Sequence, residues 1–341
     1  MARERKVTIN VIAAEAGVSV PTVSRVLNGR ADVSPTTRAR IEALLAEHGY
    51  QRRGSRRGER AGLVDLVFND LDSPWAVEII RGVEDVAHAA AIGTVVSAIH
   101  RHSAATRQWL DNLRARKSDG VILVTSTLQP AHQAELRRLN VPAVVIDPAG
   151  GPALEVPTIG ATNWAGGRAA TEHLTSLGHR RIGFIAGPAS LLCSRARLDG
   201  YRAALDAAGL PVADELVQPG DFYHESGFRG ATALMSLADP PTAIFASSDQ
   251  MAFGVYEGLR QQGLRVPDDV SVVGFDDLPE ARWASPPLTT VRQPLAEMGT
   301  LAARMLLRIA RGEETDSPRV ELATDLIVRN STMPLPPPRN S

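Results

Sequence analysis

Carboxylates, hydroxyls and aromatic rings recur just after the short apolar runs between residues 63 and 276. The residues at these positions are Asp70, Asp72, Ser73 and Trp75, then His100 and Arg101, Thr125 and Ser126, Asp147, Arg195, Ser248 and Asp249, and Asp276 and Asp277. Acids and arginine make paired hydrogen bonds with the hydroxyls of a carbohydrate, and its C–H faces stack on rings, for which Trp75, Trp164 and Phe222 are candidates. Each single acid could instead cap the helix that follows it. The set as a whole therefore carries the prediction of a carbohydrate site.

The motifs of common catalytic sites do not occur in this sequence. It contains no G-x-S-x-G nucleophile elbow, no G-x-x-x-x-G-K-[ST] phosphate loop and no H-E-x-x-H metal motif. His100 and His102 lack a third ligand at a metal-binding spacing, so surface histidines are the better interpretation. Cys193 has no evident histidine partner and is interpreted as a packing or pocket-lining residue. We expect no enzyme activity, no metal and no cofactor.

Alternating apolar runs and helical stretches fill the chain from residue 62 onward and would position these side chains. The strand-like runs are Leu63–Phe68, Gly93–Ile99, Gly120–Val124, Ala143–Ile146, Ile182–Ala186, Thr242–Ala246 and Val270–Phe275. Helix-like segments between them include Ala76–Ala89, Thr106–Arg116, Ala165–Leu177 and Met251–Gln262. This β–α repeat predicts an α/β fold with parallel sheets covered by helices on both faces, and seven or more strands predict two doubly wound lobes. Ligands of such sheets bind outside the carboxyl ends of the strands, where the polar residues fall.

The first fifty residues read as three short helices and form an all-α head. The helices span 8–16, then Ser19 to Leu27, then Ser34-Pro35 to Gly49, with Thr8, Ser19 and Ser34 as N-caps. Residues 1–60 hold twelve Lys and Arg and six Asp and Glu, a formal charge of +6 that leaves −7 on the rest of a chain whose net charge is −1. A basic head on an acidic body indicates that the head meets a polyanion, although a solvated basic tail would carry the same charge.

The second helix of the head has side chains suited to reading DNA. Val23, Val26 and Leu27 form one buried stripe, which leaves Val20, Pro21, Ser24, Arg25 and Asn28 on or near the outer face. A helix of this size fits the major groove, where arginine grips guanine bidentately and hydroxyls reach phosphate oxygens. Helix-turn-helix spacing alone also fits a generic helical hairpin. The candidate DNA-binding residues are Thr8, Ser19, Val20, Pro21, Thr22, Ser24, Arg25, Asn28, Arg56 and Arg57.

Length and composition place the chain among globular proteins of two or three domains. It has 341 residues, 44% of them hydrophobic and 22% charged. Cys193 is the single cysteine, so no intramolecular disulfide can form. The N-terminus shows no apolar signal region, and no apolar run is long enough to span a bilayer. These features predict a cytoplasmic protein with no membrane partner.

Motifs along nearly the whole chain resemble those of the lactose-repressor (LacI/GalR) family. In the head they are Thr8-Ile9, Ile12-Ala13, Ala16 to Ser19, Thr22 to Asn28, Val33-Ser34, Thr37-Arg38 and Gly49-Tyr50. Further on they are Asn163 to Gly167, Gly178 to Ile182, Ala186 to Pro188, Pro241 to Phe245, Arg265 to Val270, Gly274 to Asp277, and Pro287 to Val291 with Gln293-Pro294. So many motifs in the same order make the resemblance specific.

The resemblance implies a homodimeric regulator, usually a repressor, that binds a pseudo-palindromic DNA operator. Its body would resemble a periplasmic sugar-binding protein, with a small carbohydrate effector held between the lobes. In the head, Val20, Pro21 and Arg25 fall on the family's base-reading positions. The effector-binding residues that it implies are Asp72, Ser73, Trp75, Arg195, Phe222, Ser248 and Asp276, with Arg195 and Asp276 on sugar hydroxyls and Phe222 stacked on the ring.

The resemblance also implies domain boundaries. They are a head at 1–50, a basic linker at 51–61, a first lobe at 62–162 and 292–321, a second lobe at 163–291 and 322–333, and a disordered tail at 334–341. Family members usually carry an acid where this chain has Val11 and Thr162. They also form a hinge helix in the linker, ending in a leucine wedge. This linker has two glycines, five arginines and no leucine, the next leucine being Leu63, so we expect its arginines to act electrostatically.

Two other classes of protein share parts of this pattern. A free sugar-binding protein of a transport system would have a signal peptide and no DNA-binding head, the reverse of what the sequence indicates. A sugar-processing α/β enzyme would need a nucleophile, metal or phosphate motif. The sequence therefore predicts a carbohydrate-controlled, sequence-specific DNA-binding transcriptional regulator, acting as a repressor.

Overall fold

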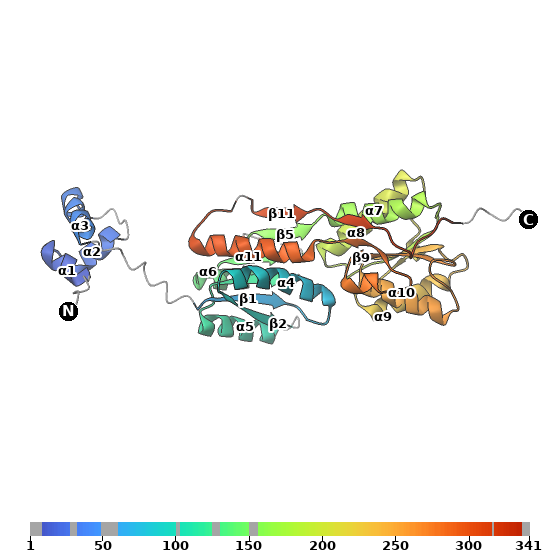
Figure 1. Cartoon of the computed structure of the whole chain (residues 1–341), viewed down its shortest axis with the longest axis horizontal. Coiled ribbons are helices and arrows are strands. Elements are labelled where there is room, and N and C mark those ends of the chain that lie inside the picture. The colour runs from blue at the N-terminus through green and yellow to red at the C-terminus, as the bar shows by residue number, and fades with distance from the viewer. Residues whose placement is uncertain are drawn as a thin grey trace, which may run out of the picture. The chain divides into compact units, whose positions relative to one another are not determined.

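The computed structural model describes residues 9–27, 33–48, 61–99, 103–124, 130–149, 156–315 and 317–335. The chain forms two compact units, residues 1–60 and 61–341, here called the head and the body (Figure 1). Several sequence predictions lie outside the described residues: those on Thr8, Asn28, the linker with Arg56 and Arg57, the segment His100 to His102, Thr125 and Ser126, and the tail beyond residue 335.

The head consists of three short helices around a small apolar core. They are α1 (Ile9–Glu15), α2 (Val20–Leu27) and α3 (Pro35–Glu47). The predicted inward residues Val23 and Val26 of α2 are buried together with Ile12 and Ile41. Ser34 caps α3, because its Oγ accepts a hydrogen bond of 3.2 Å from the backbone N–H of Thr37. The apolar spacing in the sequence thus fixes which face of α2 turns outward.

The first lobe of the body is a parallel sheet with helices on both faces. Its strand order is β11-β5-β4-β3-β1-β2, with β1 (Leu63–Phe68), β2 (Gly93–Ala98), β3 (Gly120–Val124), β4 (Ala143–Ile146), β5 (Thr158–Ala161) and β11 (Arg319–Leu322). Its helices are α4 (Pro74–Ala89), α5 (Ser103–Arg116), α6 (Pro130–Arg138) and α11 (Leu295–Arg311). Alternate residues of one strand enter separate cores: Ile122 packs with α4 and α11, and Leu123 with α5 and α6.

The second lobe repeats this architecture. Its strand order is β12-β10-β9-β8-β6-β7, with β6 (Ile182–Ile185), β7 (Val217–Gln218), β8 (Ala243–Ala246), β9 (Ser271–Asp276), β10 (Thr289–Arg292) and β12 (Asp325–Ile327). Helices α7 (Asn163–Ser176) and α8 (Leu192–Ala207) cover one face, and α9 (His224–Met235) and α10 (Asp249–Gln261) the other. Two short 3-10 helices, Asp214–Leu216 and Pro279–Arg282, lie in its loops.

The chain passes between the two sheets at three described crossovers. They join β5 to α7, β10 to α11 and β11 to β12. Two crossovers are hydrogen-bonded to each other, because the backbone N–H of Thr324 donates to Oγ1 of Thr162 over 3.0 Å. Arg292 belongs to the second sheet and Leu322 to the first, one residue beyond the boundaries expected from the sequence.

The predicted strands are present, but the expectation of wholly parallel sheets was wrong at one edge. β12 pairs with β10 in the antiparallel direction, because the chain returns from the first lobe along the outer side of β10. Five further strands, β5, β7, β10, β11 and β12, were not predicted from the sequence. These strands have two to four residues each and mix polar with apolar side chains, unlike the equally short but wholly apolar β4, β6 and β8.

Candidate functional site

A cavity lies between the two lobes at the carboxyl ends of their strands. It encloses about 750 Å³ of space, part of it open to solvent. The first lobe contributes the ends of β1 and β3 and residues just after β1 and β4. The second lobe contributes the first half of α8, the loop before α9, the start of α10 and the end of β9. The lining residues are Phe68, Asn69, Asp70, Ser73, Trp75, Ala76, Val124, Asp147, Leu191, Cys193, Arg197, Asp221, Phe222, Tyr223, Ser248, Gln250 and Asp276.

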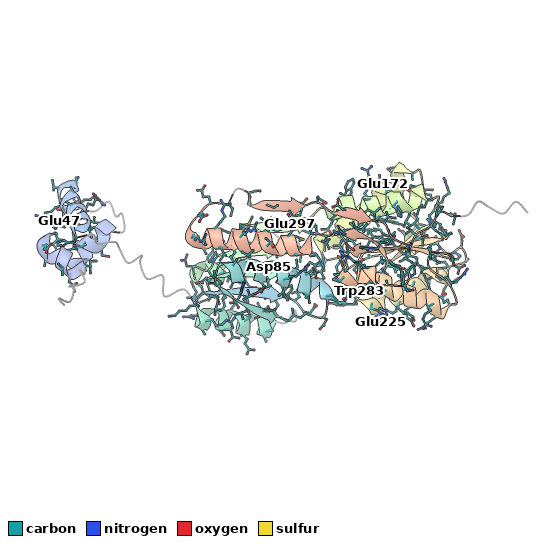
Figure 2. All side chains as sticks on the ribbon, in the orientation of Figure 1. Glu47, Asp85, Glu172, Glu225, Trp283 and Glu297 are labelled. Carbon is teal, nitrogen blue, oxygen red and sulfur yellow. The ribbon has the colours of Figure 1, made fainter. Side chains whose placement is uncertain are left out.

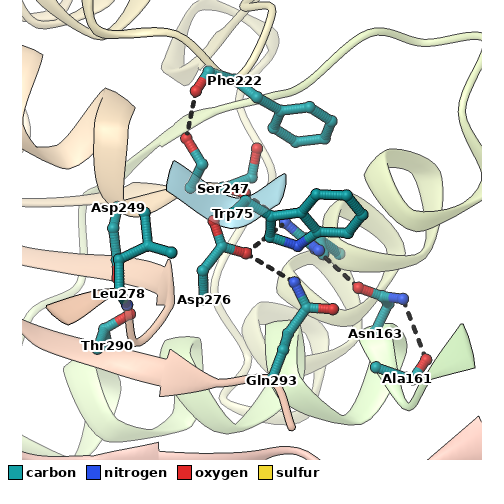
Figure 3. A network of polar contacts seen from close by, with 12 residues as sticks. Trp75, Ala161, Asn163, Phe222, Ser247, Asp249, Asp276, Leu278, Thr290 and Gln293 are labelled. Atoms are coloured by element: carbon teal, nitrogen blue, oxygen red, sulfur yellow. Dashed lines mark hydrogen bonds and ion pairs between the residues drawn. The ribbon is translucent and has the colours of Figure 1, made fainter. Parts of the chain in front are cut away.

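Arg197 of α8 is the best-anchored polar side chain of this cavity. It is 3% exposed, its Nε donates to Oδ1 of Asn163 over 2.8 Å, and its Nη1 donates to the carbonyl oxygen of Ser247 over 2.6 Å (Figure 3). Its guanidinium carbon lies 3.7 Å from the ring centroid of Phe275. Such stacking and forked donation fix the orientation of the guanidinium before any ligand binds.

Asp276 ends β9 beside this arginine. Its Oδ1 accepts a hydrogen bond of 2.7 Å from Nε2 of Gln293 and lies 3.8 Å from Nη1 of Arg197 (Figure 3). Burial raises the pKa of Asp276 to about 6, although the charge of Arg197 opposes the shift. Its backbone has a φ of 126°, which a non-glycine residue rarely adopts. This conformation points to a position where the site, and not local propensity, determines the backbone.

A second buried acid, Asp147, lies at the end of β4. Burial raises its pKa, while the charge of Arg197 and a hydrogen bond with the Cys193 thiol lower it. Burial raises the pKa of that thiol as well. A protonated thiol packed against a carboxyl is a poor nucleophile, so Cys193 lines the cavity as a packing residue, as the sequence suggested.

The aromatic wall is held in place by Ser248, the N-cap of α10. Its Oγ accepts from the backbone N–H of Met251 over 3.1 Å. It donates over 2.9 Å to the carbonyl oxygen of Phe222, where the bond is drawn in Figure 3. Phe222 has a φ of 76°. A side chain at Gly187 would place its Cβ 2.1 Å from the Phe222 ring, so only glycine leaves room for that ring.

The two lobes also touch across the cavity. The hydroxyl of Tyr223, just before α9, donates to Oδ1 of Asp70 over 2.5 Å. Asp70 follows β1 of the first lobe. Nearby, Ser73 caps α4 by accepting from the backbone N–H of Trp75. The first lobe therefore offers a ring and a carboxylate to the same space as Phe222 and Asp276.

Most of the predicted effector residues line this cavity, and two do not. Ser73, Trp75, Phe222, Ser248 and Asp276 are in its wall. Asp72 is exposed and outside it, and Asp70, two residues earlier, takes its place. Arg195, the arginine chosen from the sequence, is exposed and lies outside the wall, and the arginine in the wall is Arg197.

The spacing along α8 could have corrected this choice. Cys193, Arg197 and Tyr201 are four residues apart and are all buried, as expected for one face of a helix. Arg195 lies two residues from that stripe, on the opposite side. Trp164 lies outside the cavity wall and is 43% exposed. Asp249 is buried behind the wall, where it accepts hydrogen bonds from Thr290 Oγ1 and the backbone N–H of Leu278.

On the head, α2 presents an outer surface made of the predicted residues. Ser19, Val20, Pro21 and Arg25 are exposed, whereas Val23 on the opposite side is fully buried. The hydroxyls of Ser19 and Thr22 lie 2.9 Å apart at the start of this helix. An exposed arginine and hydroxyls at a helix N-terminus fit a DNA groove and its phosphates.

Neither a metal site nor a membrane span is found within the described ranges. No group of three or more His, Cys, Asp or Glu there is placed to hold a metal ion. No helix there is long and apolar enough to cross a membrane.

Comparison with known proteins covers the whole chain. Residues 8–53 match the model of "bacterial regulatory proteins, lacI family", and residues 171–332 match the periplasmic binding protein-like domain. The HTH-type transcriptional repressor CytR of Escherichia coli is 35% identical over 338 residues, 98% of each chain. A transcriptional regulator CelR–cellobiose complex has a TM-score of 0.74 at 36% identity, with 96% of this chain and all of that one covered. The lac repressor dimer bound to operator and the anti-inducer ONPF has a TM-score of 0.71 at 31% identity, with the same coverage.

Proposed function

Because this chain belongs to the lacI family of bacterial regulatory proteins, we propose that it is a DNA-binding transcriptional repressor controlled by a small carbohydrate. The observation that carries the proposal is the presence, in one chain, of a helix-turn-helix head and a body whose two lobes enclose the Arg197–Asp276 pair. The head binds a specific operator, and the body senses the effector. The protein acts as a sensor and not as an enzyme, in the compartment that holds the DNA.

The outer surface of α2 reads the operator. Arg25 reaches a guanine edge in the major groove, and Val20 and Pro21 make apolar contacts with bases. Ser19 and Thr22 bind phosphate oxygens. The chain acts as a homodimer, whose two heads bind the two half-sites of a pseudo-palindromic operator, and a lac repressor dimer bound to its operator has the same fold.

The carbohydrate binds between the lobes. Arg197 uses Nε and Nη1 for its own anchoring, which leaves Nη2 to donate to a hydroxyl. Asp276 accepts from the same or the neighbouring hydroxyl, so that the pair recognises a diol. The rings of Phe222 and Trp75 stack on the C–H faces of the sugar. Both lobes contribute to these contacts, so the ligand favours one relative position of the lobes over others.

The test is operator binding by the full chain with and without sugars. An operator is first selected from random duplex DNA, and its affinity is measured by fluorescence anisotropy against a panel that includes cellobiose, the ligand named for a similar regulator. We expect one sugar to weaken operator binding by a factor that corresponds to about 1–3 kcal/mol. Failure to select any preferred duplex would reject the DNA-binding part. A selected operator whose affinity no carbohydrate changes would reject the sensor part.

A further inference from the structure

Among the described residues that line the cavity between the lobes, carboxylates outnumber cations. Asp70, Asp147, Asp221 and Asp276 line it, and among the described lining residues Arg197 alone carries a positive charge. The acids come from both lobes, so the surplus does not depend on one loop. If both buried acids, Asp147 and Asp276, are protonated, the two remaining acids still outnumber the one arginine.

The charge of Arg197 is already engaged within the protein. Its Nε and Nη1 are bound to Asn163 and to the Ser247 carbonyl, and its guanidinium is stacked on Phe275. It also supports the ionised forms of Asp147 and Asp276, whose pKa values burial raises. A phosphate group would compete with these carboxylates for a single guanidinium. Sites that bind phosphate usually offer it several cationic or N–H donors.

Helix N-termini could supply such donors, but two of them at this cavity are occupied. The first turn of α4 is capped by Ser73, which accepts from the N–H of Trp75. The first turn of α10 is capped by Ser248, which accepts from the N–H of Met251. In each of these two helices, one first-turn N–H that an anion could use is thus already bound by a serine of the protein.

Two of the lining acids, one from each lobe, are hydrogen-bonded to Tyr223 at the edge of the cavity. Asp221 is exposed, and its Oδ1 accepts a hydrogen bond of 2.9 Å from the backbone N–H of Tyr223. Asp70 is half-buried and accepts from the Tyr223 hydroxyl. Tyr223 thus binds one acid from each lobe, Asp221 through its backbone N–H and Asp70 through its hydroxyl. These acids accept hydrogen bonds from hydroxyl groups and repel anionic ones.

We infer that this cavity takes an uncharged polyhydroxylated ring and rejects the same ring when it carries a phosphate ester, with Asp70 and Asp221 as the residues that enforce the choice. The inference rests on the proposed function of the cavity as the effector site. It narrows the effector class to neutral sugars and to neutral compounds with a sugar diol.

The first experiment measures matched pairs by titration calorimetry on the full chain. The pairs are glucose and glucose 6-phosphate, ribose and ribose 5-phosphate, and cellobiose and cellobiose 6′-phosphate. We expect the neutral member of any pair that binds to be tighter by about tenfold or more, because like charges in an enclosed site are strongly penalised. An ester that binds as tightly as its parent sugar, or more tightly, overturns the inference.

Charge-removing variants assign the effect to the named acids. Asp70→Asn/Asp221→Asn keeps an oxygen for each Tyr223 contact and removes both charges. We expect the double variant to reduce the ratio of sugar affinity to ester affinity by several-fold. The control Asp239→Asn removes an exposed acid that pairs with Arg181 outside the cavity, and it should leave the difference unchanged. An unchanged difference in the double variant overturns the role of these two acids.

If none of the six compounds binds, quenching of Trp75 fluorescence decides the question without a ligand. Trp164→Phe/Trp283→Phe leaves Trp75 as the accessible tryptophan, because Trp109 is only 4% exposed. Trp283, 77% exposed (Figure 2), is the surface reference in Trp75→Phe/Trp164→Phe. We expect iodide, relative to uncharged acrylamide, to quench Trp75 several-fold less than Trp283. If the ratio of iodide quenching to acrylamide quenching is as large at Trp75 as at Trp283, or larger, the inference is overturned.

The two proposals fail in different ways. A phosphate ester that releases the operator leaves the sensor function intact and overturns the choice of ligand charge. An operator indifferent to every carbohydrate overturns the sensor function, whereas the quenching experiment still tests the charge of the cavity.

Discussion

Nε2 of Gln293 lies 2.7 Å from Oδ1 of Asp276, so a crossover between the lobes is hydrogen-bonded to a carboxylate of the cavity. Gln293 is 5% exposed and directly follows β10, where the chain turns into α11 of the other lobe. The acid proposed to bind the effector is thus tied to a segment that moves when the lobes move. We therefore expect effector binding at Asp276 to change the relative position of the lobes through this hydrogen bond.

Gln293→Met should weaken the coupling between effector and operator. Methionine has a similar size but cannot donate to Asp276, and a hydrogen bond to a charged group contributes about 1.5–3 kcal/mol. We expect the effect of sugar on operator affinity to fall several-fold while some sugar binding remains. The control Gln261→Met changes an exposed glutamine of α10 that binds Glu257. If sugar changed the operator affinity of Gln293→Met as much as that of the unmodified chain, the Gln293 hydrogen bond would not couple the two sites.

Arg197→Ala should abolish the effector response, and Arg195→Ala should not. Loss of Arg197 removes a ligand donor and leaves Asp276 and Asp147 without their cation, which for buried pairs costs about 3–5 kcal/mol. Titration calorimetry measures sugar affinity, and urea unfolding measures stability. Arg195, two residues away and exposed, is the matched control. Loss of sugar binding in Arg195→Ala would favour Arg195 as the effector-binding arginine after all.

The stability of the body should carry a signature of Asp276 between pH 4 and pH 6. Burial raises its pKa from 3.8 to about 6 in the folded state, so the folded body binds this proton more tightly than the unfolded chain. The proton on Asp276 therefore stabilises the folded body at low pH. This stabilisation, up to about 3 kcal/mol, is lost as the pH rises through that window. Arg197 opposes the shift, and the buried Asp147 and Asp249 titrate in the same direction.

Asp276→Asn isolates this contribution. The free energy of unfolding in urea is compared between the variant and the unmodified chain at pH 4 and at pH 7. We expect the variant to gain roughly 1–3 kcal/mol relative to the unmodified chain between these two values. The exposed Asp239→Asn serves as control. The same difference at both pH values would mean that Asp276 titrates as an ordinary carboxyl.

Arg25→Ala should weaken binding to the selected operator by about 1–3 kcal/mol and relax the preference at one base pair in each half-site. The reason is that alanine cannot make a bidentate contact with guanine. Arg40→Ala changes an exposed arginine of α3, and any effect should be the same for all DNA sequences. If Arg25→Ala kept full affinity and preference, α2 would not be the helix that reads bases.

The linker prediction concerns residues outside the described part of the chain. Arg56→Ala/Arg57→Ala should flatten the dependence of operator affinity on salt by roughly one unit of slope for each arginine–phosphate pair that the substitutions remove in each subunit. Affinity is measured between 50 and 200 mM salt, the range over which strongly electrostatic complexes weaken by about three to five orders of magnitude. A slope equal to that of the unmodified chain would favour a flexible tether. A sharply kinked operator with Leu63 inserted would contradict the electrostatic interpretation.

The sequence predicted the architecture because apolar periodicity and strand length reflect burial directly. Val23 and Val26 marked the inner face of α2, and runs such as Gly120–Val124 indicated strands with both faces covered. Part of the cavity wall, including Asp70, Asp147 and Asp276, was also predictable, because the carboxyl ends of parallel strands converge. Arg197 was missed although the spacing of Cys193, Arg197 and Tyr201 marks the buried face of α8, and that spacing does not give the partners that orient the guanidinium. Its contacts with Asn163 and Ser247 come from distant parts of the chain.

The crossovers between the lobes also set an order for folding during synthesis. The second lobe lies almost entirely within residues 163–292, whereas α11 and β11 of the first lobe lie beyond residue 294. A ribosome therefore completes nearly all of the second lobe while the first still lacks the helix that packs on Ile122 and Val144. Because domains fold as units when their last elements emerge, the second lobe can become native before the first lobe, which precedes it in the chain, does. The apolar face of the first lobe then stays exposed until the end of translation. During that interval the chain is prone to aggregate and can be bound by a chaperone.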